Sequence, residues 1–255
     1  MEKNIVFELV NNVGTIKINR PEAYNALNQK IVHELDEIIE QVRENDSIKV
    51  LIIGSDHNFA AGGDIKAMID CTPEEAMKFG FSSTFNKIEN LPIPTIAAID
   101  GYALGGGLEL ALTCDMRIAT KEAKLGLPET GLGIMPGAGG SIRLPRLVGS
   151  SKAKEMIFMG TVLRGEEAEK IGLVNKAVNK DELMETALKW ADKLKKKGPL
   201  ALKMAKETIV AGLTLDLKSG IDLEAKNWAD LFNTSDQKEG MNAFIQKRKP
   251  EFQGK

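Results

Sequence analysis

Two glutamates beside glycine-rich turns are the residues best suited to chemistry in this chain. Glu109 follows the glycines at 105–107, and Glu129 precedes a second glycine-rich stretch that ends at residue 140. Apolar residues crowd both, and a carboxylate in such surroundings is costly unless it is hydrogen-bonded or catalytic. A pair of carboxylates near exposed backbone N–H groups indicates acid–base chemistry on a polarised carbonyl.

Each motif also has a purely structural interpretation. Glycines at 105–107 could serve a turn or close packing. Glu109 could complement a helix dipole, and Glu129 could be an ordinary acid at a helix start after Pro128. The chemical interpretation therefore depends on the combination of the two motifs.

Other reaction classes lack their usual residues. The sequence contains only His33 and His57 as histidines, and only Cys71 and Cys114 as cysteines, without a CxxC pair. There is no Gly-x-Ser-x-Gly motif and no glycine motif typical of nicotinamide or ATP binding. Metal-dependent hydrolysis, serine hydrolysis and nucleotide-dependent chemistry all lose support.

The composition is that of an ordinary globular protein. With 255 residues, the chain forms one large domain or two small ones. A formal charge of −2 gives no reason to expect nucleic acid or a membrane surface as a partner. Two unpaired cysteines, no signal core and no long apolar run favour a soluble cytoplasmic protein.

Short apolar segments alternate with helical patterns up to about residue 180, which indicates an α/β protein. The strands are too short and too irregularly spaced for a plain doubly wound sheet. After residue 180 the pattern is helical, and Trp228 and Phe232 lie on one helical face that must dock on the core or on a partner. We expect strands at 4–10, 13–19, 50–53, 94–99, 116–119 and 173–178, and helices at 28–45, from Gly106, at 181–197, from Pro199, at 217–232 and at 236–247.

Several long motifs, in order, give the chain a family resemblance nearly from end to end. It resembles the crotonase superfamily, specifically the enoyl-CoA hydratases. The motifs that carry the resemblance occupy 18–28, 59–66, 96–110, 114–119, 126–140 and 237–244. The resemblance implies a spiral of ββα turns over residues 1–190. It also implies a helical region over 191–255 that packs into homotrimers or into hexamers, as dimers of trimers.

The resemblance also implies a reaction. Enoyl-CoA hydratases add water reversibly across the C2=C3 bond of trans-2-enoyl-CoA thioesters to give 3-hydroxyacyl-CoA. The catalytic carboxylates map onto Glu109, which orients and activates the water, and Glu129, which delivers a proton to C2. The N–H groups of Ala61 and Gly106 are expected to form the oxyanion hole. No metal or redox cofactor is expected, because the thioester itself accepts the electrons and CoA is part of the substrate.

The CoA portion of the substrate is expected at two segments, and residues 67–85 are expected to shape the acyl pocket. The sequence departs from the family pattern at Gly63, where alanine is frequent, and at Ile142, where glutamine is frequent. The predicted CoA contacts are Ala23, Tyr24, Ala26, Leu27, Ala60, Gly62, Asp64, Ile65 and Lys66.

Two alternatives remain open from the sequence. An enoyl-CoA isomerase has the same fold and oxyanion hole but typically lacks a carboxylate at the position of Glu109, so the two glutamates favour hydration. A non-catalytic binding relative, such as an RNA-binding one, is the other alternative. The acidic pI and the lack of a basic stripe argue against RNA. The acyl-chain length stays open.

Overall fold

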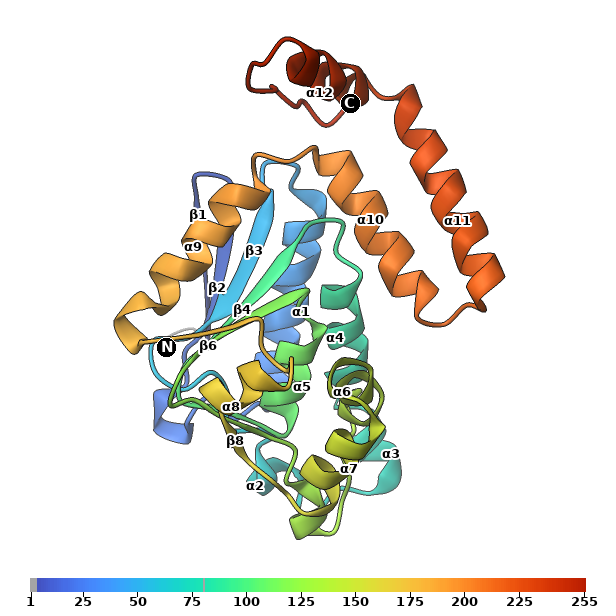
Figure 1. Cartoon of the computed structure of the whole chain (residues 1–255). Helices are drawn as coiled ribbons and strands as arrows, with labels where there is room; N and C mark the ends of the chain where they lie inside the picture. The colour runs from blue at the N-terminus through green and yellow to red at the C-terminus, as the bar shows by residue number, and fades with distance from the viewer. Residues whose placement is uncertain (1–3, 80) are drawn as a thin grey trace.

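A six-stranded sheet forms the centre of the molecule in this computed structural model, which describes residues 4–79 and 81–255 (Figure 1). The first two strands are antiparallel and every later pair in this sheet is parallel. In sheet order, the strands are β1 (Ile5–Val10), β2 (Val13–Ile18), β3 (Val50–Gly54), β4 (Thr95–Ile99), β6 (Met116–Thr120) and β9 (Lys176–Val178).

The predicted hairpin between β1 and β2 is confirmed. Asn11 and Asn12 both have positive φ angles, a conformation that asparagine tolerates better than most residues, and Val10 pairs with Val13 across the turn. The predicted strand at 173–178 is shorter than expected. The N–H groups of Leu173 and Val174 donate to the Ala168 carbonyl instead of to a neighbouring strand.

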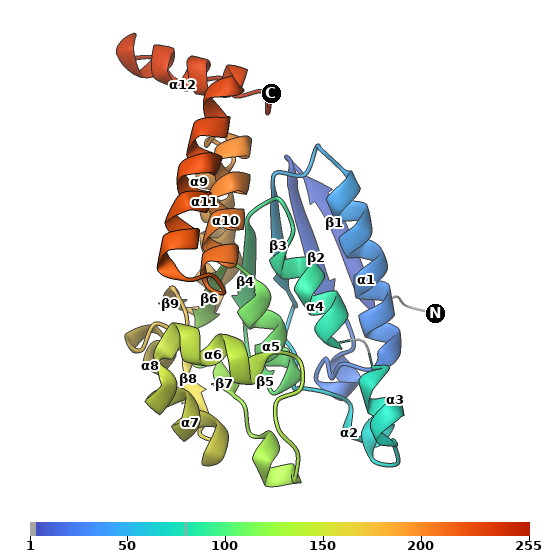
Figure 2. The same ribbon diagram turned by 90° about the vertical axis from the view of Figure 1, so that its right-hand side faces the viewer.

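Helices cover both faces of the large sheet, as parallel strands require. β3 and β4 are buried along their whole length. α1 (Gln29–Glu44) and α5 (Gly106–Thr113) pack on one face, and α9 (Leu183–Leu194) packs on the other (Figure 2).

A second, three-stranded sheet was not predicted, because its strands have only two or three residues each. It consists of β5 (Tyr102–Leu104), β7 (Lys124–Gly126) and β8 (Leu163–Arg164). The remaining helices of the body are α2 (Ile65–Met68), α3 (Pro73–Met77), α4 (Phe81–Glu89), α6 (Gly140–Val148), α7 (Ser150–Phe158) and α8 (Gly165–Lys170). Short 3₁₀ turns are η1 (Pro21–Ala23), η2 (Glu129–Leu132), η3 (Lys180–Glu182) and η4 (Leu231–Asn233).

The C-terminal helices form an arm that extends from the body (Figure 1). The arm contains α10 (Pro199–Gly212), α11 (Leu217–Asp230) and α12 (Ser235–Ile245). The predicted boundary between residues 190 and 191 falls inside α9, a continuous helix whose buried face belongs to the sheet layer. The arm therefore begins after α9. Among the described residues, no helix is both long and apolar enough to cross a membrane.

Candidate active site

The first turn of α5 is fixed by a close backbone contact. A side chain at Gly107 would overlap the carbonyl oxygen of Ala60, so only glycine allows this approach. Ala60 is held in turn by β5, because its N–H donates to the Tyr102 carbonyl and its own carbonyl accepts from the N–H of Leu104. The segment around residue 60 is thereby seated against the N-terminal end of α5.

Two N–H groups at this contact are available to an outside acceptor. Gly106 begins α5, and an α-helix leaves its first N–H groups without internal partners. The nitrogen of Gly63 lies 3.6 Å from the position that a Cβ atom on Gly106 would take. Neither N–H donates to another group within the described residues. Two donors from segments far apart in sequence thus lie close together.

The structure contradicts the predicted role of Ala61. Its N–H donates to the Tyr24 carbonyl at 3.0 Å and is therefore already paired. This bond joins the segment around residue 60 to the segment around residue 24. Gly63, two residues further along, supplies the unpaired N–H beside Gly106 instead.

Glu109 is a buried carboxylate held by a backbone cradle. It lies in the first turn of α5, and only 3% of its surface is exposed. Its Oε1 accepts hydrogen bonds from the N–H groups of Ala138, at 2.7 Å, and Gly140, at 2.8 Å. Burial raises the pKa of Glu109, and these hydrogen bonds together with the charge of Arg143 oppose that rise. The cradle therefore fixes the direction of the carboxylate and favours its ionised form.

Glu129 is a carboxyl group with an unsatisfied oxygen. Its Oε2 is buried and has no hydrogen-bond partner within the described residues. The other oxygen, Oε1, lies 3.1 Å from the position that a Cβ atom on Gly105 would take, so the glycine, at φ +49°, leaves room for it. Burial first, and then the negative charge of Glu109, raise the pKa of Glu129 to about 7. Such a group gains or loses a proton near neutral pH, as a general acid or base must.

The two segments predicted to bind CoA lie side by side. The N–H of Leu27 donates to the Gly62 carbonyl at 2.7 Å, and the N–H of Asp64 donates to the Leu27 carbonyl at 2.8 Å. Of the predicted contact residues, Tyr24, Ile65 and Lys66 are exposed at this junction, Ala23, Ala26 and Asp64 are half-buried, and Leu27, Ala60 and Gly62 are buried.

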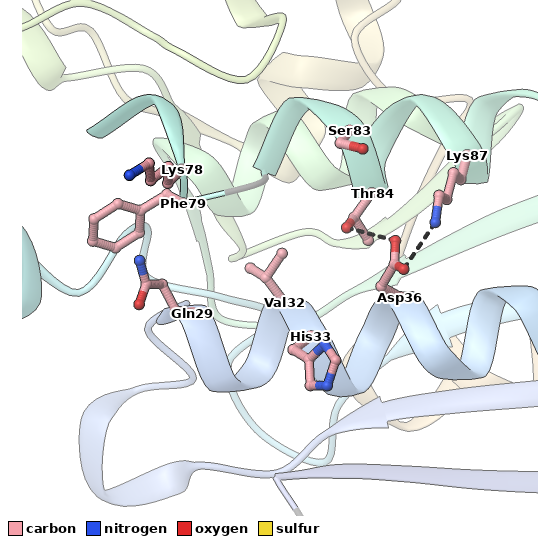
Figure 3. Close-up of a pocket in the computed structure, with 9 residues that line it drawn as sticks. All are labelled: Gln29, Val32, His33, Asp36, Lys78, Phe79, Ser83, Thr84 and Lys87. Carbon is pink, nitrogen blue, oxygen red and sulfur yellow. Dashed lines mark hydrogen bonds and ion pairs between the residues drawn. The ribbon is translucent and has the colours of Figure 1, made fainter. Parts of the chain in front are cut away.

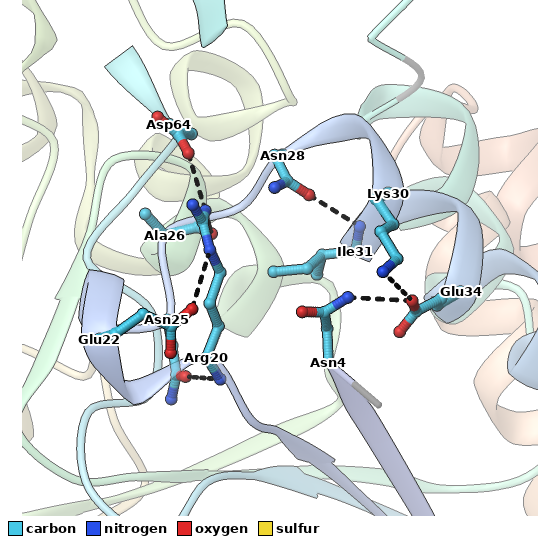
Figure 4. A network of polar contacts seen from close by, with 10 residues as sticks. All are labelled: Asn4, Arg20, Glu22, Asn25, Ala26, Asn28, Lys30, Ile31, Glu34 and Asp64. Atoms are coloured by element: carbon cyan, nitrogen blue, oxygen red, sulfur yellow. Dashed lines mark hydrogen bonds and ion pairs between the residues drawn. The ribbon is translucent and has the colours of Figure 1, made fainter. Parts of the chain in front are cut away.

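Asp64 has a structural task at this junction. Its Oδ2 accepts from Nη1 of Arg20 at 2.7 Å, and that guanidinium also reaches the Ala26 carbonyl (Figure 4). The hydrogen bond from Arg20 lowers the pKa of Asp64. Oδ1 of Asp64 caps α2 by accepting from the N–H of Lys66. Asp64 thus fixes the shape of both segments, and the predicted CoA contacts themselves stay predictions.

The region expected to shape the acyl pocket approaches Gly63. A Cβ on Gly63 would lie 2.9 Å from Cε of Met68 and 4.0 Å from the ring of Phe81. The side chain of Met68 thus fills the space that a methyl group would take at residue 63. Phe81 also packs against Phe79 and Phe85. Residue 80, within the expected region, lies outside the described residues.

Neither described pocket contains the two glutamates. One pocket of about 410 Å³ lies between α1 and the α3–α4 region and is lined by His33, Asp36 and Lys87, among others (Figure 3). Lys87 is already paired there with Asp36 and Glu40. A second pocket, of about 270 Å³, lies in the arm. Neither lining includes a predicted catalytic, oxyanion-hole or CoA-contact residue, although the first includes Lys78, Phe79, Ser83 and Thr84 from the segment expected to shape the acyl pocket.

Sequence reasoning missed the cradle of Glu109 and the donor at Gly63. The glycine-rich stretch 137–140 was the only signal of the cradle, because successive glycines leave backbone N–H groups open to a ligand or a side chain. Nothing in the local sequence distinguishes the paired N–H of Ala61 from the free N–H of Gly63.

Comparisons with known proteins agree with this arrangement. The fold is the crotonase fold: a crystal structure of an enoyl-CoA hydratase from Bacillus anthracis superimposes with a TM-score of 0.95, at 39% identity, over 99% of this chain and 100% of that one. Over residues 8–255 the sequence matches the enoyl-CoA hydratase/isomerase family. The chain belongs to that family.

Two curated relatives are similar over nearly their whole length. The short-chain-enoyl-CoA hydratase of Clostridium acetobutylicum is 44% identical over 253 residues, which cover 97% of each chain. The crotonyl-CoA hydratase of Syntrophomonas wolfei is 42% identical over 254 residues, which cover 98% of each chain.

Proposed function

We propose that this protein is an enoyl-CoA hydratase that adds water reversibly to trans-2-enoyl-CoA thioesters and gives 3-hydroxyacyl-CoA. One observation carries the proposal: the buried carboxyl of Glu109 and the half-buried carboxyl of Glu129, whose Oε2 has no partner, lie beside the N–H groups of Gly63 and Gly106, which are unpaired within the described residues. The names of the relatives, a short-chain-enoyl-CoA hydratase and a crotonyl-CoA hydratase, support the same reaction.

In the proposed mechanism, the thioester oxygen accepts hydrogen bonds from the N–H groups of Gly106 and Gly63. Water attacks C3, and the electrons of the C2=C3 bond move toward the thioester, so that negative charge develops on its oxygen. Donors held in place before the reaction stabilise that charge, and each is worth about 3–4 kcal/mol in the transition state. The positive end of the α5 dipole adds to this stabilisation.

The two glutamates then divide the proton transfers between them. Glu109, ionised and fixed by its cradle, orients the water and accepts its proton as the oxygen bonds to C3. Glu129, protonated, delivers its proton to C2. The pair holds one proton before and after the reaction, and dehydration uses the same steps in reverse. Each transfer contributes about 10²–10⁴ in rate.

The substrate and the assembly complete the proposal. The CoA portion lies along the exposed face at Tyr24, Ile65 and Lys66, beside the oxyanion donors. The reaction uses no metal or redox cofactor, so added chelator leaves the rate unchanged. The protein acts in the cytoplasm as a homotrimer or hexamer held together by its arm.

Hydration of crotonyl-CoA tests the proposed function directly. Loss of the absorbance of the conjugated thioester should follow addition of the purified protein. The variants Glu109→Gln and Glu129→Gln should abolish most of the activity, and Glu166→Gln, a glutamate exposed on α8, serves as the matched control. A wild-type protein that moves a double bond in 3-enoyl-CoA but adds no water would support the isomerase alternative instead.

A further inference from the structure

Arg143 on α6 is a largely buried cation that donates four hydrogen bonds to three partner residues. Only 11% of its side chain is exposed. Its Nε and Nη2 donate to the two carboxylate oxygens of Glu89, at 3.0 and 2.7 Å, and Nη2 also reaches Asn86. Its Nη1 donates to the carbonyl oxygen of Ala138 at 3.0 Å. The guanidinium therefore spans from α4 to the loop that precedes α6.

Ala138 connects this arginine to the active site. Its N–H donates to Oε1 of Glu109, and its carbonyl accepts from Arg143. The two peptide groups that flank Ala138 are thus held from opposite sides. A continuous series of hydrogen bonds runs from Glu109 through Ala138 and Arg143 to Glu89, and charge-assisted bonds of this kind are shorter and stronger than neutral ones.

α4, which carries Glu89 at the end of this series of hydrogen bonds, is itself packed into the core. Phe85 and Ile88, on the buried face of α4, have no exposed surface. A second bond joins α4 to the same loop, because the hydroxyl of Ser82 donates to the Gly137 carbonyl at 3.0 Å. The loop that supplies the cradle N–H groups is therefore attached to α4 at two places.

We infer that Arg143, paired with Glu89, is a positioning residue that holds the 137–140 loop so that its N–H groups fix Glu109 for attack by water. The inference rests on the proposed function. Arg143 does not touch the substrate and acts only through Ala138 and Glu109. A displacement of about 1 Å in a catalytic group reduces the rate by about a hundredfold, so such a support has a measurable effect.

Kinetics of Arg143→Met test the inference, with Arg146→Met as the matched control. Arg146 lies on the same helix, is exposed, and makes no hydrogen bond or ion pair within the described residues. We expect kcat on crotonyl-CoA to fall by about 10–100-fold in Arg143→Met while KM changes by less than about threefold. In Arg146→Met both values should stay at the wild-type level.

A double variant separates positioning from general damage to the fold. If Arg143 acts through Glu109, adding Arg143→Met to Glu109→Gln should lower kcat no further. A loss of equal size in both backgrounds would overturn the inference, as would unchanged kcat in Arg143→Met. Glu89→Gln, which keeps the shape of the side chain, replaces Arg143→Met if that variant does not fold. It should also lower kcat, and an unchanged kcat would contradict the inference.

Hydrogen exchange tests the same support without any substrate. The backbone N–H groups of Ala138 and Gly140 should exchange about tenfold faster in Arg143→Met than in Arg146→Met. Equal exchange in the two variants would refute the positioning role even if the wild-type protein adds no water to crotonyl-CoA. Faster exchange in Arg143→Met than in Arg146→Met, together with a wild-type protein that lacks hydratase activity, would count against the proposed function alone.

Discussion

The negative charge of Glu109 raises the pKa of Glu129, in addition to the larger effect of burial. Backbone donors hold Glu109, whereas Oε2 of Glu129 is buried and has no hydrogen-bond partner in the part of the chain that the structure describes. The two carboxyls therefore titrate as a coupled pair, and the state with one proton places that proton preferentially on Glu129. This is the protonation state that the proposed hydration requires.

The first prediction concerns pH. Above about pH 7, Glu129 loses its proton and the pair becomes doubly ionised, so kcat/KM for hydration should fall. Dehydration also needs the pair with one proton, because it is the reverse of the same steps. We expect both directions to show the same decline in kcat/KM. Initial rates with crotonyl-CoA and with 3-hydroxybutyryl-CoA, measured from pH 5 to 9, check this prediction; a hydration profile that stays flat to pH 9 would contradict it.

The second prediction concerns the two carboxyls in combination. Glu109→Gln and Glu129→Gln should each lower kcat by about 10²–10⁴. The double variant should lose less than the product of the two factors, because both groups act on one water and one substrate. Steady-state kinetics of the four proteins provide the measurement. Fully multiplicative losses would show that the two glutamates act independently.

The third prediction compares neighbouring glycines. A side chain at Gly106 meets only ordinary contacts, so Gly106→Val should fold, but its methyl groups would enter the space in front of the N–H of Gly63. We expect kcat/KM to fall by about 10²–10³ with little change in Tm. Gly107→Ala should instead lower Tm, because its methyl group overlaps the Ala60 carbonyl. Thermal unfolding and steady-state kinetics of both variants separate an effect on catalysis from an effect on stability. An unchanged kcat/KM in Gly106→Val would exclude Gly106 as an oxyanion donor.

The fourth prediction is a pH-dependent change in stability. The folded-state pKa of Glu129, about 7, lies above its unfolded value. The contribution of Glu129 to the free energy of unfolding is therefore complete below the unfolded pKa and is lost as the pH rises through about 7. Relative to Glu129→Gln, the wild-type free energy of unfolding should fall by about 2 kcal/mol from pH 4 to pH 8, a value reduced for solvent screening. Denaturant titrations at several pH values provide the test, and a constant difference would argue against the raised pKa.

The fifth prediction concerns the arm. Trp228 is 63% exposed and Phe232 is 40% exposed, with their ring centroids 4.7 Å apart. Exposed apolar patches of this kind typically mark protein–protein contacts, so we expect a trimer or hexamer. Trp228→Gln should shift the mass measured by light scattering toward the monomer. Val10→Gln, an exposed apolar residue on β1, is the control. A wild-type monomer at micromolar concentration would contradict the prediction.

The sequence predicted the class of fold and the helical C-terminal part, and it singled out the two glutamates, whose catalytic roles stay predictions. It could not predict which N–H group near residue 61 is free, because that depends on the Tyr24 carbonyl, which is distant in sequence. For the same reason it missed β5, whose three residues become a strand only beside β7. It also placed a domain boundary inside α9, because the docking of Ala187 and Ala191 on the sheet has no local signal.

The contact between Gly107 and the Ala60 carbonyl has a consequence for how the protein acquires activity as it folds. The N–H groups of Gly63 and Gly106, on either side of this contact, belong to segments that α2, α3, α4, β4 and β5 separate in the sequence. Contacts between residues so distant in sequence form slowly. A refolding chain should therefore regain its helical circular dichroism before its first turnover, and enzymatic activity would report the closing of this single contact.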